Sequence, residues 1–135
     1  MALRWKEEQY STGNALIDAQ HKELFDRIVL LLKASEIPER KAEVLNMMDF
    51  LGEYVLEHFA CEEAAMEGVA RSKQEENRRD HEWFVQQFRM LRAQLEAEGV
   101  TEVLRQALMG LVVQWLEVHV AQVDSSLRGA APNKD

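Results

Sequence analysis

The sequence predicts an all-α protein, an up-down-up-down four-helix bundle preceded by an extended N-terminal arm. Four long segments carry apolar residues at the 3.6-residue period of an α-helix. No segment alternates apolar and polar residues for long enough to indicate a strand. The chain also has only two prolines and six glycines, and its connections are short. Short connections favour antiparallel neighbours, so the 135 residues are expected to form one domain.

The first two helices are expected at about residues 18–34 and 38–66. Asp18 is a candidate N-cap, Pro38 suits the first turn of the second helix, and Gly68 fits its C-terminal stop. The apolar stripe of the first helix comprises Ile17, His21, Leu24, Phe25, Ile28, Leu31 and Leu32. The stripe of the second comprises Val44, Met47, Met48, Leu51, Val55, His58, Phe59 and Glu62.

The last two helices are expected at about residues 73–98 and 101–127. Gly99 ends the third helix, and Thr101 opens the fourth with Glu102 in its first turn. Their stripes comprise Asn77, His81, Phe84, Phe88, Leu91 and Leu95, and then Leu104, Leu108, Leu111, Val112, Trp115, His119 and Val123. Residues 1–17 are interpreted as an arm whose Trp5 and Tyr10 could pack on the bundle.

Composition excludes several classes of partner. A net charge of −8 disfavours nucleic acid, which needs a basic face. The longest apolar run, ALMGLVVQWL, is too short to span a bilayer, so no membrane association is expected. No leader peptide is evident and Cys61 is the single cysteine, which together favour a cytoplasmic location. The charges of EEAAMEG and QEENRRD are most simply solvated surface.

The four histidines of the chain, His21, His58, His81 and His119, lie on the apolar stripes of four different helices. One such histidine alone is most often a hydrogen-bonded core residue, but four of four are not easily a coincidence. Glu62 shares a helix face with His58 because four residues advance about 400°. Burying these groups without partners would be costly, whereas a shared cation removes that cost.

Imidazole with carboxylate suits iron, manganese or zinc, and a bundle core is a known location for two-metal sites. Two ions fit the number of candidate ligands better than one. The role of Asp124 is less clear. It follows His119 by five residues, which puts the two side chains about 140° apart on an ideal helix. From spacing alone Asp124 is a surface carboxylate, unless the last turn loosens or the side chain reaches across.

The motifs around these residues resemble the bacteriohemerythrins of the hemerythrin family. They comprise Trp5, IDAQHKELF with His21, HFACEEAAM with His58 and Glu62, DHEWF with His81, and WLEVHVAQVD with His119 and Asp124. The resemblance implies a bundle around a non-haem di-iron centre, two Fe2+/Fe3+ ions with a bridging oxo or hydroxo group. It implies that His21 and His58 ligate one iron, that His81 and His119 ligate the other, and that Glu62 and Asp124 bridge them.

One residue departs from the family's pattern. The third-helix motif of the family has two histidines four apart, and the first of these is Asn77 here. The resemblance therefore implies four histidine ligands in place of five and an open or altered ligand position on the second iron. We expect weaker iron retention and less stable oxygen binding as a result.

The resemblance implies a protein that binds dioxygen for carriage, storage or sensing. Leu24, Phe59, Trp115 and Leu116 lie within one turn of the ligands; they are core residues in any interpretation, and the resemblance adds that they form the oxygen pocket. The alternative is a di-iron redox enzyme acting on peroxide or nitric oxide, favoured by Asn77. A third interpretation is a bundle that has lost iron and serves as an interaction module or binds another metal. No catalytic side chain is predicted, and the sequence does not identify a protein partner.

Overall fold

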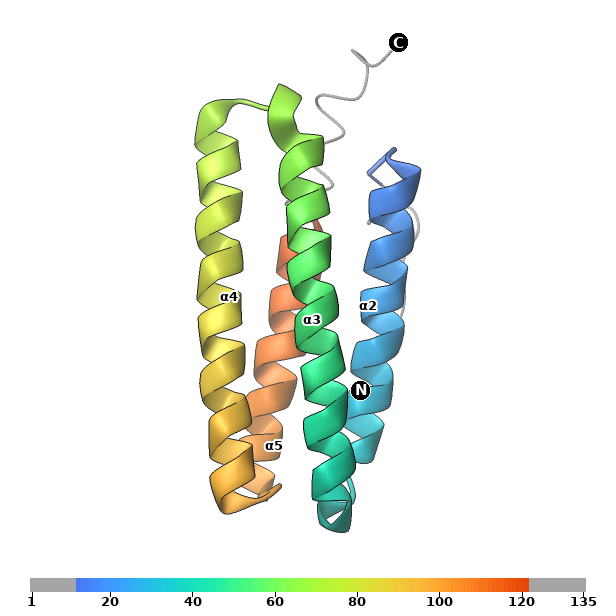
Figure 1. Cartoon of the computed structure of the whole chain (residues 1–135), viewed down its shortest axis with the longest axis vertical. Coiled ribbons are helices and arrows are strands. Elements are labelled where there is room, and N and C mark those ends of the chain that lie inside the picture. Colours follow the sequence, from blue (N-terminus) through green and yellow to red (C-terminus); the bar gives the residue numbers. More distant parts are fainter. Residues whose placement is uncertain (1–11, 122–135) are drawn as a thin grey trace.

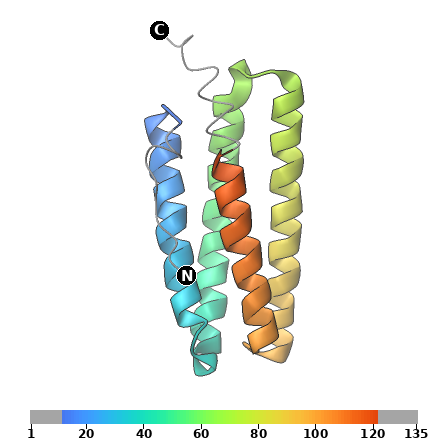
Figure 2. The ribbon, with the colours of Figure 1, turned by 180° about the vertical axis from the view of Figure 1, so that it is seen from behind.

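Four helices run alternately up and down in the computed structural model, which describes residues 12–121 (Figure 1). They are α2 (Ala15–Ala34), α3 (Lys41–Ala65), α4 (Arg71–Glu98) and α5 (Glu102–Met109). Seen from behind, α5 lies between α2 and α4 and covers the face of α3 (Figure 2). No strand occurs within residues 12–121, so the predicted all-α four-helix bundle is confirmed. Trp5, Tyr10, Val123 and Asp124 lie outside the described residues.

Short non-α turns flank the helices. The 3₁₀ turn η1 (Pro38–Arg40) leads into α3, and the 3₁₀ turn η2 (Met66–Gly68) follows it. The π-helical segment η3 (Gly110–Gln114) continues α5, and α-helix resumes over residues 115–121. Among the described helices, none combines the length and the apolar character needed to cross a membrane.

The first helix begins earlier than the sequence predicted, and its cap is a different residue. Asn14 has an extended backbone, and its side chain accepts a hydrogen bond from the Ile17 amide at 3.1 Å, which makes it the N-cap of α2. The prediction that Asp18 is the cap was wrong. Asp18 lies in the first turn, where its carboxylate accepts bonds from the amide and hydroxyl of Thr12, both at 2.8 Å.

Two of the other predicted boundary signals, Gly99 and Thr101, are confirmed, whereas Pro38 and Gly68 lie in the 3₁₀ turns η1 and η2 that flank α3. Gly99 follows α4 with a φ of +89°, a backbone conformation that favours glycine. The Thr101 side chain accepts from the Leu104 amide at 3.1 Å and caps α5.

The core follows the predicted stripes closely. The predicted stripe of α4 is buried throughout. Leu32, Met47 and Leu111 are partly buried at the margin of the core. The residues that form the buried core on the last helix are Leu104, Leu108, Val112, Trp115, Leu116 and Val120.

The π-helical segment was not predicted, and it corrects the register of the last helix. Buried residues four apart, such as Leu104, Leu108 and Val112, drift about 40° around an α-helix at each step. The wider turn of η3 takes up an extra residue immediately after this drift has accumulated. Leu116 and Val120, which continue the four-residue spacing, consequently stay on the buried face beside Trp115 and His119.

Candidate metal centre

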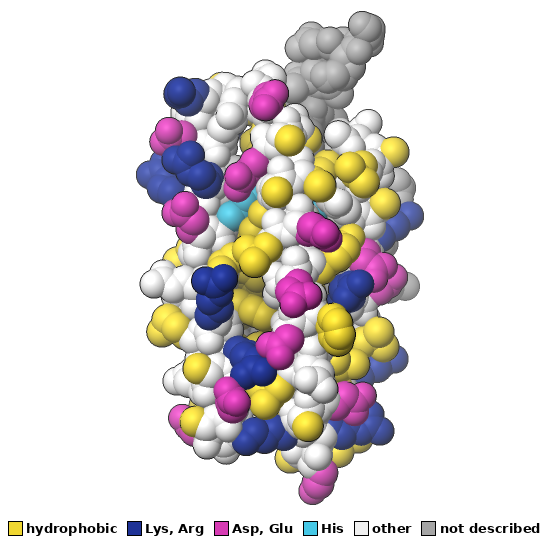
Figure 3. Space-filling view, in the orientation of Figure 1, with side chains coloured by type: hydrophobic (Ala, Val, Ile, Leu, Met, Phe, Trp, Pro, Cys, Tyr) yellow, Lys and Arg dark blue, Asp and Glu magenta, His cyan; other side chains and the backbone are white. Residues whose placement is uncertain are grey.

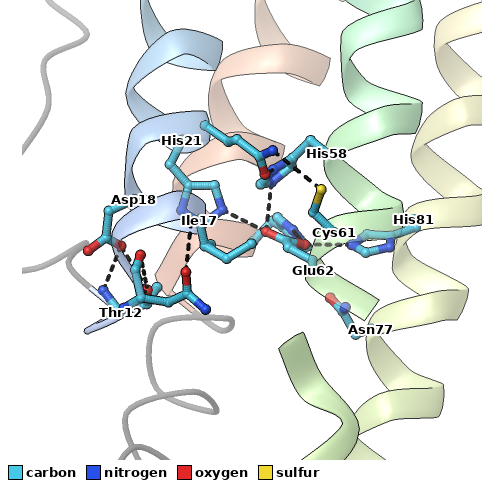
Figure 4. Close-up of polar contacts among 12 residues, drawn as sticks. Thr12, Ile17, Asp18, His21, His58, Cys61, Glu62, Asn77 and His81 are labelled. Carbon is cyan, nitrogen blue, oxygen red and sulfur yellow. Dashed lines mark hydrogen bonds and ion pairs between the residues drawn. The ribbon is translucent and has the colours of Figure 1, made fainter. Parts of the chain in front are cut away.

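Four imidazoles from four helical segments meet one carboxylate at the centre of the bundle (Figure 4). Glu62 is fully buried, and no histidine is more than 3% exposed. His21 Nε2 and His58 Nε2 lie 2.6 and 2.7 Å from Glu62 Oε2. His81 Nε2 and His119 Nε2 lie 2.9 and 3.0 Å from Glu62 Oε1. The structure therefore gathers the four histidines in two pairs, one pair on each oxygen of Glu62.

The outer ring nitrogens of three histidines bond to side chains on the preceding helix. These pairs are His58 Nδ1 with Gln20 Oε1 at 2.8 Å, His81 Nδ1 with Glu63 Oε2 at 3.0 Å, and His119 Nδ1 with Asp80 Oδ2 at 2.9 Å. Carboxylates only accept hydrogen bonds, so Nδ1 of His81 and of His119 must carry the proton. Gln20 directs its amide nitrogen to Cys61 Sγ at 3.4 Å, which leaves its oxygen to accept from His58.

Sequence reasoning missed these three acceptors. Glu63 and Asp80 belong to the charged runs that we interpreted as solvated surface. Glu63 is exposed and Asp80 is half-buried, but each also accepts a hydrogen bond from a histidine of the site, which that interpretation did not include. A signal was available, because Gln20, Glu63 and Asp80 each stand next to a stripe residue of the site. A neighbour in sequence points about 100° away on a helix, towards the adjacent helix of the bundle.

These outer bonds decide what the inner nitrogens present to Glu62. A neutral imidazole that donates from Nδ1 has a lone pair on Nε2. His58 Nε2 lies 2.7 Å from Glu62 Oε2 but without the geometry of a hydrogen bond. Two electron-pair donors in contact are stable only if a proton or a cation lies between them. The donor atoms of His21, His58, Glu62 and His119 all lie within 4.8 Å of one another, so the residues present fit a bound cation.

The shifts in pKa indicate which groups of the metal-free site carry charge. Burial lowers the pKa of His119, but the charge of Glu62 and the hydrogen bond to Asp80 outweigh it and raise this pKa to about 9. Burial raises the pKa of Glu62, but the charge of His119 and the imidazole hydrogen bonds hold it well below its usual value. Burial lowers the pKa of His58 despite its contact with Glu62. A proton on His119 therefore balances Glu62, and His58 stays neutral.

Apolar and aromatic side chains close one side of the cluster. Leu24, Phe59, Trp115 and Leu116, the predicted oxygen-pocket residues, are all buried. The Phe59 ring stacks on His81 with 3.6 Å between centroids, and the Trp115 ring stacks on His119 at 4.4 Å. Trp115 Nε1 also donates to Asp80 Oδ2 at 3.2 Å. These contacts fix the planes of the His81 and His119 imidazoles.

Asn77 lies beside the cluster, one turn before His81 on α4 (Figure 4). It is 9% exposed, and its Nδ2 donates to Met66 Sδ at 3.1 Å. Neither Glu62 nor a histidine bonds to it. A cavity of about 80 Å³ adjoins it, lined by Glu63, Met66, Gln74, Asn77 and Arg78.

The fold and the site define a class of protein: a helical bundle whose buried histidine and glutamate side chains can hold a metal. The family model described as "Hemerythrin HHE cation binding domain" matches residues 12–131. The chain belongs to the hemerythrin family. This membership and the His/Glu cluster support a non-haem iron protein.

Curated relatives cover most of the chain. A bacteriohemerythrin of Pseudomonas paraeruginosa is 32% identical over 124 residues, which are 91% of this chain and 77% of the relative. One of Pseudomonas aeruginosa is 31% identical with the same coverage. One of Methylococcus capsulatus is 28% identical over 122 residues, which are 90% of this chain and 91% of the relative. No solved structure matches the chain significantly.

Proposed function

We propose that the chain holds two iron ions, with an oxo or hydroxo bridge, and binds dioxygen. In this proposal His21 and His58 hold one ion, His81 and His119 hold the other, and Glu62 bridges them. Asp124, which the family resemblance implies as a second bridge, is part of the same proposal. The observation that carries the proposal is the division of four Nε2 atoms between the two oxygens of Glu62.

When bound, a pair of iron ions supplies reversible electron transfer to dioxygen. The protein's own residues supply orientation and an apolar lining. Gln20, Glu63 and Asp80 hold three of the imidazoles with Nε2 directed inward, so that these three ligand directions exist before an ion binds. Phe59 and Trp115 pack on the rings of the second pair, which holds the imidazole planes and places apolar surface beside the ligand positions.

The direct test is metal content and colour. We expect two irons per chain after anaerobic ferrous loading, and a visible absorption band under oxygen that disappears under vacuum. A matched control is His119→Gln, which keeps a polar side chain but removes the inward imidazole; it should lose iron and colour together. Zero or one iron per wild-type chain would overturn the proposal.

A second candidate function is a di-iron redox enzyme acting on peroxide or nitric oxide. Asn77 favours it, because this amide bonds to no residue of the cluster and borders a cavity where the family has a further histidine. Rapid autoxidation with turnover of peroxide would favour the enzyme, and a long-lived reversible oxygen adduct would favour carriage, storage or sensing. The cytoplasmic location expected from the sequence stays a prediction.

A further inference from the structure

A hollow of about 380 Å³ opens between α3 and α4, and none of the candidate metal ligands lines it. Its floor is apolar, because Met48, Val55, Phe84 and Phe88 line it and none of them is more than 5% exposed. Surface hollows of roughly 300–1,000 Å³ with an apolar lining and a few polar groups are typical sites for small molecules. The size and the lining therefore fit a small ligand that has an apolar part.

The two walls of the hollow carry opposite charges. Asp49 and Glu53 stand on the α3 wall, and Arg89 and Arg92 stand on the α4 wall. In the space-filling view, hydrophobic side chains lie in this seam, with acidic groups on its α3 side and basic groups on its α4 side (Figure 3). A complementary ligand turns a cationic group towards α3 and an anionic group towards α4.

The walls are joined by an ion pair at one end of the hollow only. Arg92 Nε and Nη2 donate to the two carboxylate oxygens of Asp49 at 2.9 and 3.0 Å. Glu53 lies one turn after Asp49, and Arg89 lies one turn before Arg92. Within residues 12–121, neither the Glu53 nor the Arg89 side chain forms an ion pair or a hydrogen bond. Both charged groups are therefore available to a ligand in the hollow.

Gly52 keeps part of the floor open. It lies in the interior of α3, where glycine is less favourable than alanine. Its φ is not positive, and a Cβ at this position would lie 3.5 Å from Phe88 Cε2, an ordinary van der Waals distance. Neither the backbone nor the packing of α3 therefore requires glycine here. What the missing side chain provides is free space over the Phe88 ring.

We propose that this hollow binds a free apolar α-amino acid, such as phenylalanine or leucine. The ammonium group of the ligand donates to the Glu53 carboxylate, and its carboxylate accepts from the Arg89 guanidinium. Its side chain lies on the apolar floor at Phe84 and Phe88. A simple carboxylate, amine or hydrocarbon matches only part of this arrangement. The site goes beyond the proposed function, because it needs no metal.

The experiment titrates the full chain with phenylalanine and follows backbone amide signals by NMR. We expect saturable shifts at Gly52 and Val85, which line the hollow. Three analogues each lack one part of the ligand: 3-phenylpropionate has no ammonium group, 2-phenylethylamine has no carboxylate, and glycine has no apolar side chain. Each should bind at least about tenfold more weakly, because each leaves one contact unmade.

Substitutions in the two walls test the same contacts from the protein side. Arg89→Gln and Glu53→Gln should each weaken phenylalanine binding about tenfold. Arg79→Gln and Glu57→Gln are the matched controls, since they remove the same charges from exposed positions of the same helices that do not line the hollow, and they should leave binding unchanged. Gly52→Leu fills the floor and should abolish binding, with far-UV circular dichroism to check that the variant folds.

Three results would overturn the proposal. The first is equal affinity for phenylalanine and for either analogue that carries a single charge. The second is equal phenylalanine binding by Arg89→Gln and Arg79→Gln. The third is a dimer in sedimentation velocity that Arg89→Gln dissociates, because a second copy of the chain would then occupy the hollow. None of these measurements involves iron, so their outcome is separate from that of the proposed function.

Discussion

Replacing Glu62 by Gln tests the centre of the site most directly. The substitution keeps the shape of the side chain and removes a negative charge that four imidazole nitrogens approach within 3.0 Å. In the metal-free protein this leaves the His119 imidazolium, whose pKa the Glu62 charge raises to about 9, without its buried partner. In the proposed iron-loaded protein it removes a ligand that both histidine pairs share.

The expected size of the effect follows from burial. Breaking a fully buried charge pair by removing one partner costs about 3–5 kcal/mol. For a domain of this length, that lowers Tm by roughly 10–20 °C. We also expect iron content to fall from two ions per chain to one or none, because a neutral amide is a weaker ligand than a carboxylate.

Glu63→Gln is the matched control, since it makes the same change one residue along α3. The Glu63 side chain is 44% exposed, and among residues 12–121 it bonds only to the outer nitrogen of His81, so its removal should cost less than about 1 kcal/mol. Thermal unfolding of both metal-free variants at equal pH and ionic strength, with metal analysis after loading, gives the comparison. Equal Tm shifts, or two firmly held irons in Glu62→Gln, would refute the placement of Glu62 at the centre.

Four further outcomes are expected. Asp80→Asn should weaken iron binding about 10–100-fold in a chelator competition, because His119 loses a charged hydrogen-bond partner. The control Asp49→Asn changes an exposed carboxylate that bonds to Arg92 and should leave iron binding unchanged. Asn77→His should raise iron retention and lengthen the life of the oxygen adduct; if both stay as in wild type, position 77 is not at the metal. Thr101→Ala should cost about 1 kcal/mol in urea unfolding through loss of the α5 cap, and no measurable loss would show that the cap contributes nothing. Ferrous loading should raise Tm as iron concentration rises, since ions that bind only the folded state stabilise it, and chelation should reverse the change.

The parts of the fold that depend on periodicity were predictable. The α4 stripe is buried as predicted from Asn77 to Leu95, because the helix is regular over its whole length and packs one face inward. The start of α2 was missed, since both Asn14 and Asp18 are residues that favour an N-cap and only the backbone conformation distinguishes them. The π-helical segment was missed because its register correction depends on how the last helix packs against its neighbours.

The inner part of the site was predictable for a related reason. His21, His58, Glu62, His81 and His119 each interrupt an apolar stripe, so their burial followed from the helix period. Gln20, Glu63 and Asp80 stand beside the stripes, at positions whose side chains can face either solvent or a neighbouring helix. The structure shows that the neighbouring helix supplies the imidazole in each case.

The three outer histidine bonds also bear on how such a protein is made in a cell. Each joins two helices that are consecutive in the chain, first α2 to α3, then α3 to α4, then α4 to the last helix. The chain can close these links one after another as it leaves the ribosome, with no metal at hand. The bundle and the orientation of these three imidazoles therefore do not wait for a metal to be bound.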